Sequence, residues 1–120
     1  MEVTRADKVL RWFIEGEQGQ IRKEIGGTHI LDDDYVPIWV HLSLRTPGEG
    51  TRPLKVDITD GGVSIFDDKP ALVANQSDVV WTTIPGEVML EDSVIKLNRD
   101  QIANIYSGED LTVELGLVRA

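Results

Sequence analysis

Alternation of apolar and polar residues is the feature that most constrains the fold of this chain. It recurs in three stretches, YVPIWVHLSLR (35–45), LKVDITDGGVSIF (54–66) and LTVELGLV (111–118). Because successive side chains of a β-strand point to opposite faces, each stretch predicts a strand with one buried and one solvated face. The predicted buried sets are Ile38, Val40, Leu42 and Leu44, then Val56 and Ile58, and finally Leu111, Val113, Leu115 and Leu117.

The middle stretch predicts a β-hairpin. A two-residue turn at Asp60-Gly61 would supply the positive φ values of a type I′ turn. In this register Ile58 faces Val63 and Asp57 faces Ser64. A turn at Gly61-Gly62 would instead set Asp60 against Val63, so the apolar pattern favours the first register.

Five weaker stretches complete the predicted strands, at 9–14, 21–25, 71–74, 79–83 and 93–97. A short helix is expected near 98–107, because Asn98 can cap it, Gln101 has capping-box spacing and Gly108 can end it. Many short strands separated by turn residues are typical of sandwiches and jelly rolls. The predicted fold is therefore an all-β, antiparallel, jelly-roll-like β-sandwich. We expect a single domain over 1–120 with an irregular or arm-like N-terminus at 1–8.

Composition narrows the function classes. The chain has 120 residues, a formal net charge of −9 and no cysteine. The Lys and Arg residues are scattered, which argues against nucleic acid as a partner. No apolar run reaches the roughly 18 residues that a membrane span needs, and the charged N-terminus is unlike a signal peptide. Synthesis in the cytoplasm is the expectation, with no membrane partner.

Catalytic and metal-binding motifs are not evident. His29 and His41 are the only histidines, and neither has a metal-ligand spacing. The acidic run Asp32-Asp33-Asp34 offers oxygen ligands for calcium, but it lacks the alternating spacing of a calcium loop and is read as a solvated turn. A carboxylate pair for glycoside hydrolysis would be spatial, so no sequence pattern marks one. We therefore expect no catalytic residues, no cofactor and no metal.

Large aromatic side chains give the only hint of a contact surface. Trp39 and His41 fall on the predicted polar face of their strand, and either Trp12 or Phe13 must point outward in the first strand. An exposed tryptophan favours a protein partner, a sugar or another subunit. A second layer of the fold covering Trp39 is the alternative. Trp12, Trp39 and His41 are thus the candidate interface residues, and Asp60 and Gly61 the structural turn.

The order of several motifs resembles that of β-sandwich domains in tailed-bacteriophage virion proteins. The motifs are WFIEG at Trp12–Gly16, Thr46-Pro47-Gly48, Leu54–Phe66, Asp100–Ile102 and Gly108–Leu115. The resembling domains include capsid decoration proteins and modules of head and tail fibres. The resemblance implies a jelly-roll-like domain that works by assembly, commonly as a homotrimer, without chemistry of its own.

The leading hypothesis is accordingly a non-enzymatic virion structural protein, made in the host cytoplasm and located in the virion. Capsid decoration or a head or tail fibre adaptor is the favoured role, and the expected partners are further copies of the chain and a major capsid or tail or neck protein. A carbohydrate-binding module that uses Trp39, His41 and nearby carboxylates is the alternative. A hydrolase with an acidic pair is the third hypothesis.

Overall fold

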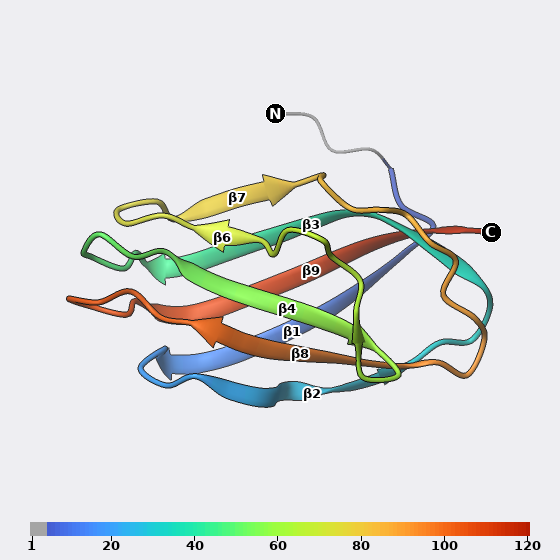
Figure 1. Ribbon diagram of the computed structural model, residues 1–120, viewed down its shortest axis with the longest axis horizontal. Coiled ribbons are helices and arrows are strands. Elements are labelled where there is room, and N and C mark those ends of the chain that lie inside the picture. Colours follow the sequence, from blue (N-terminus) through green and yellow to red (C-terminus); the bar gives the residue numbers. More distant parts are fainter. Residues whose placement is uncertain (1–4) are drawn as a thin grey trace.

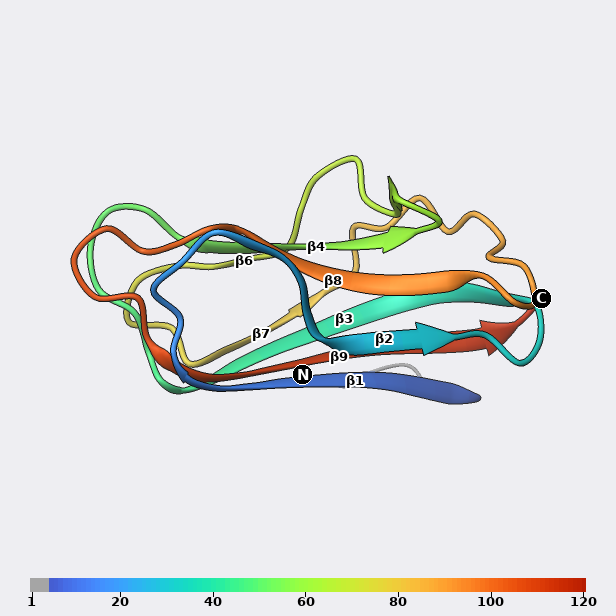
Figure 2. The same ribbon diagram turned by 90° about the horizontal axis from the view of Figure 1, so that it is seen from below.

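The structure is a computed structural model that describes residues 5–120, and over that range the chain forms nine strands in two antiparallel sheets. The two sheets lie over one another as two layers (Figures 1 and 2). The first sheet has the order β1 (Lys8–Glu17), β9 (Glu109–Arg119), β3 (Tyr35–Thr46) and β7 (Asp78–Trp81). The second has the order β2 (Arg22–Ile30), β8 (Val94–Gln101), β4 (Leu54–Asp60) and β5 (Val63–Ser64), and β6 (Ala71–Leu72) also pairs with β4. The predicted all-β, antiparallel class is confirmed.

The predicted N-terminal arm is only partly described. Its first residues, 1–4, lie outside the described range, while residues 5–7 precede β1 without joining a strand. The Asp7 backbone N–H donates to the Leu117 carbonyl at 2.8 Å.

The predicted buried faces hold for most positions. All of the predicted inward residues of β4 and β9 are buried, as are Val40, Leu42 and Leu44 of β3. Ile38 is the exception, because β3 carries one extra residue between Pro37 and Trp39 where it pairs with β9. This bulge shifts the alternation, so that buried Pro37 pairs with Leu117 and Ile38 is partly exposed. A bulge of this kind leaves no mark in an apolar pattern.

The hairpin turn lies one residue later than predicted, so the partner of Val63 changes from Ile58 to Asp60. Asp60 pairs with Val63, and Gly61 and Gly62 occupy the turn with φ of 59° and 88°. The predicted turn at Asp60-Gly61 is therefore wrong, although Gly61 does lie in the turn. Both central positions of a type I′ turn require positive φ, and two glycines adopt it without the steric cost that Asp60 would carry. Val63 is 71% exposed as a consequence.

The predicted helix at 98–107 does not form. Asn98 lies within β8, where it pairs with Asp57, and its side-chain oxygen accepts the Glu24 backbone N–H at 2.9 Å. The chain after β8 turns and forms a bridge between Tyr106 and Glu49. Pairing of β8 with two neighbouring strands thus outweighs a helix signal of about two turns, which is marginal by itself.

The outside of β4 is covered, contrary to the solvated face that alternation predicted. Asp57 and Thr59 are only 6% and 7% exposed. The chain leaves the sheet after β5, passes outside β4 and returns to pair as β6 (Figure 2). Segment 65–70 therefore forms a cover over the second sheet.

Candidate functional site

Trp12 belongs to the core, so the expectation that it lies at an interface is wrong for this residue. It is 0% exposed, its indole N–H donates to the Gly27 carbonyl at 3.1 Å, and its ring meets the His29 ring edge-on at 4.8 Å. A Cβ at Gly26 would lie 3.2 Å from the Trp12 Cβ, which shows how closely β2 approaches β1. Phe13 points outward instead and is 53% exposed.

Trp39 lies on the outer face of the first sheet, as predicted, and is partly exposed. Its neighbour on β9 is Gly116. A Cβ placed on Gly116 would fall 2.2 Å from the Trp39 Cε2 atom, so the indole ring occupies the space of the missing side chain. Glycine at this position therefore seats the tryptophan close against the sheet.

His41 lies between two carboxylates on the same face. Its Nδ1 is 3.3 Å from Glu114 Oε1 on β9, and its Nε2 is 3.4 Å from Asp78 Oδ2 on β7. A protonated imidazole donates from both nitrogens, whereas a neutral one donates from only one. The strand order β9-β3-β7 creates this arrangement, because the three residues come from three neighbouring strands.

Apolar side chains of β1 extend this surface. Val9 is 44% exposed and pairs with Gly116 across the strands, and Phe13 pairs with Thr112. We call this surface the Trp39 face, defined by Val9, Phe13, Trp39, His41, Asp78 and Glu114. It combines aromatic and aliphatic groups with carboxylates, and Trp39 and His41 are brought together on it as predicted.

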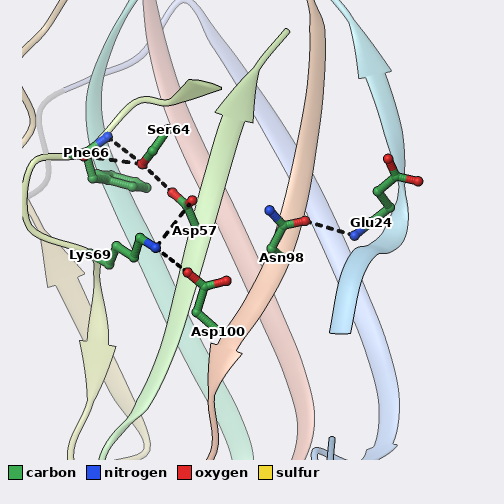
Figure 3. A network of polar contacts seen from close by, with 7 residues as sticks. All are labelled: Glu24, Asp57, Ser64, Phe66, Lys69, Asn98 and Asp100. Carbon is green, nitrogen blue, oxygen red and sulfur yellow. Dashed lines mark hydrogen bonds and ion pairs between the residues drawn. The ribbon is translucent and has the colours of Figure 1, made fainter. Parts of the chain in front are cut away.

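A polar network lies on the outside of the second sheet (Figure 3). Ser64 Oγ donates to Asp57 Oδ1 at 2.5 Å, and Lys69 Nζ lies 3.7 Å from Asp57 Oδ2 and also donates to Asp100. The hydrogen bond to Asp100 is the main cause that raises the pKa of Lys69, so this lysine stays protonated. A charged lysine is no base for Ser64. The network instead fastens the covering segment to β4 and β8.

A second polar cluster, not predicted from the sequence, holds the β1–β2 connection on β8. The Arg99 guanidinium is buried; its Nη1 donates to Gln18 Oε1 and its Nε donates to the Gln20 carbonyl at 2.5 Å. Gln18, itself fully buried, donates to the carbonyls of Ile14 and Gly16. Burial lowers the pKa of Arg99, with a further contribution from Arg22. Since the oxygens that Arg99 contacts belong to this chain's own turn, the cluster is a structural tie.

The acidic run at 32–34 is used locally. Asp32 accepts hydrogen bonds from Lys8 and Tyr35, at 2.9 and 2.8 Å. Asp34 accepts the Glu91 backbone N–H at 2.8 Å. Among residues 5–120, no group of three or more His, Cys, Asp or Glu side chains is placed to hold a metal ion. Over the same range, no helix is long and apolar enough to cross a membrane.

Neither the protein-family models nor the curated protein sequences give a significant match to this chain. The candidate site that the geometry defines is therefore the Trp39 face, a contact surface on a sheet.

Proposed function

We propose that this chain is a non-enzymatic structural domain of a bacteriophage virion, a jelly-roll-like β-sandwich that acts through subunit assembly. Its role would be capsid decoration or adaptation of a head or tail fibre. The Trp39 face would be its contact surface with further copies, commonly in a trimer, or with a capsid, tail or neck protein. The order of motifs along the chain supports the virion setting.

The observation that carries the assembly role is the presence of Phe13 and Val9, 53% and 44% exposed, on the same sheet face as Trp39. Aromatic side chains are enriched at protein interfaces relative to the rest of the surface. Aromatic residues in such positions often carry most of the binding free energy. The Trp39 ring is also held in place by its fit over Gly116, so little conformational entropy would be lost on binding.

A carbohydrate-binding role is the second candidate, and the grouping of Trp39 with His41, Glu114 and Asp78 favours it. An indole face can stack on a sugar ring, while carboxylates and an imidazole accept or donate hydrogen bonds to hydroxyls. Both candidates use the same face, so they differ in the partner.

Two measurements test this proposal. Light scattering gives the mass in solution, and co-sedimentation with purified particles of the phage that encodes the chain shows whether the protein binds them. Phe13→Ser and Trp39→Ala should abolish self-association or particle binding while the far-ultraviolet spectrum stays unchanged. Ile105→Ser is the matched control, because Ile105 is an exposed apolar residue, 75% accessible, outside the Trp39 face. A monomer that is absent from particles and does not bind them would contradict the proposal. A monomer whose Trp39-dependent fluorescence responds to glycans would move the second candidate to first place.

A further inference from the structure

A cleft lined by both polar and apolar residues lies at the end of the molecule away from the 46–54 connection. Two connections, 31–35 and 84–93, meet there with the β4–β5 turn (Figure 1). Tyr35 and Met89 exchange backbone hydrogen bonds of 2.8 and 2.9 Å, and the Gly61 N–H donates to the Val94 carbonyl at 3.1 Å. The cleft has a volume of about 340 Å³. No residue of the Trp39 face lines it.

Buried apolar side chains form the floor of this cleft and exposed ones form its rim. Phe66 and Met89 are 6% and 2% exposed, whereas Val63 and Val88 are 71% and 51% exposed. Leaving two valines this accessible beside an apolar floor costs free energy that a bound apolar group would recover. The full lining is Pro37, Asp60, Val63, Ser64, Ile65, Phe66, Asp67, Pro85, Glu87, Val88 and Met89.

The charges around the cleft have one sign. Asp60, Asp67 and Glu87 line it, and no Lys, Arg or His does so among the described residues. These three carboxylates form no ion pair with any other described side chain. The segments that build the cleft, 60–67 and 84–89, contain no basic residue at all. A cation in a partner would therefore meet uncompensated negative charge, and an anion would be repelled.

We propose that this cleft docks a segment of a partner protein in which an apolar side chain is flanked by lysine or arginine. The apolar side chain enters between Val63 and Val88 and reaches the floor at Phe66 and Met89. The flanking cations lie against Asp60, Asp67 and Glu87. This second surface is independent of the Trp39 face and binds a partner of different chemistry.

Short synthetic peptides test the proposal, with binding followed residue by residue in two-dimensional amide NMR spectra of the full chain. A peptide alternating arginine and leucine should bind and shift the signals of 60–67 and 85–89. Oligolysine of the same charge should bind about tenfold more weakly, because it lacks the apolar group that fills the cleft. A peptide alternating glutamate and leucine should not bind. High salt should weaken the binding of the arginine–leucine peptide, because salt screens exposed charges.

Two pairs of variants distinguish binding in the cleft from nonspecific electrostatic or hydrophobic binding elsewhere on the surface. Val88→Thr should lower the affinity several-fold, whereas Val73→Thr should not, although Val73 is 55% exposed and also apolar. Glu87→Gln should weaken binding more than Glu15→Gln, which removes the same charge from an exposed position on β1.

The proposal is overturned if the arginine–leucine peptide leaves the cleft signals unshifted, or if oligolysine binds equally well. Equal effects of each variant and its control would also overturn it. Because the Trp39 face is outside the cleft, Phe13→Ser should leave peptide binding unchanged. Failure of the virion proposal and failure of this docking proposal are therefore distinguishable.

Discussion

Gly116 shows how much a single missing side chain determines on the Trp39 face. Gly116→Ala places a methyl group 2.2 Å from the Trp39 ring, so the indole must move. We expect a loss of roughly 1–3 kcal/mol in the free energy of unfolding, as for other overpacked sites. Urea unfolding and the Trp39 fluorescence, taken as the difference from Trp39→Phe, measure it.

The control is Gly19→Ala. A Cβ at Gly19 would lie 3.8 Å from Ser107 Oγ, which is ordinary contact. If both alanine variants lose the same stability, the fit of the indole over Gly116 is not the cause.

Ser64 illustrates a side chain that sequence alternation places on a solvated face but that the structure makes important. Ser64→Ala removes the donor to Asp57, whose side chain is only 8% exposed. We expect a cost of about 1–3 kcal/mol, because a buried carboxylate loses a hydrogen bond. Thr112→Ala, on the outer face of β9, should be mild by comparison. Chemical unfolding of the two variants side by side gives the answer, and equal costs would mean that Asp57 finds another donor.

The hairpin of β4 and β5 gives a prediction at the level of the element. The observed register puts Gly62 in the turn at φ of 88° and Asp60 in a strand. Gly62→Thr should cost about 1–2 kcal/mol, because a β-branched residue resists positive φ. Asp60→Thr should cost little, since threonine suits a strand.

The two threonine variants distinguish the registers. No atom lies within 4 Å of a Cβ at Gly62, so its cost would be purely conformational. If Asp60→Thr lost more stability in thermal unfolding than Gly62→Thr, the turn would instead lie at Asp60-Gly61.

Strands could be predicted where one face of the stretch is uniformly apolar. They could not where both faces carry apolar residues or where the residues also suit a helix. In β9, and in β3 after its bulge, the inward residues predicted by the alternation are buried. In β4 the predicted inward residues are buried too, but Asp57 and Thr59 on the other face are also covered, which the alternation did not predict. In β1, apolar residues occupy both faces, so the sequence left open whether Trp12 or Phe13 points outward. The false helix at 98–107 arose because Asn98 has a capping residue's chemistry, while its actual partner, the Glu24 N–H, comes from a distant strand.

The contact surfaces were predictable in part for the same reason. Trp39 and His41 share a face because they are two residues apart in a strand. Their partners Glu114 and Asp78 depend on the order β9-β3-β7, which no local pattern encodes. The cleft was not predicted, because connections far apart in the sequence build it.

At the scale of the whole molecule, acid should weaken the tie between the two ends of the chain. Asp110 accepts the Gly16 backbone N–H at 2.7 Å and pairs with Arg45 at 2.5 Å. The backbone hydrogen bond first, and Arg45 second, lower the pKa of Asp110. A carboxylate whose pKa is lower in the folded state stabilises the fold above its unfolded pKa, and this contribution is lost as the pH falls through the folded value.

Asp110→Asn isolates that contribution. Near neutral pH the variant should be less stable than the parent chain, and the difference should shrink below about pH 4. Urea midpoints measured across this range test the prediction. A difference that is constant with pH would show that the ionised carboxylate contributes nothing specific.

The cover formed by segment 65–70 has a consequence for aggregation. The strands on this border of the second sheet, β5 and β6, are only two residues each. A foreign strand needs a longer row of free backbone groups to add to a sheet edge and begin cross-β stacking. Lys69, bound to Asp57 and Asp100, keeps the intervening chain in place. This border of the second sheet therefore resists strand addition and the growth of fibrils from it.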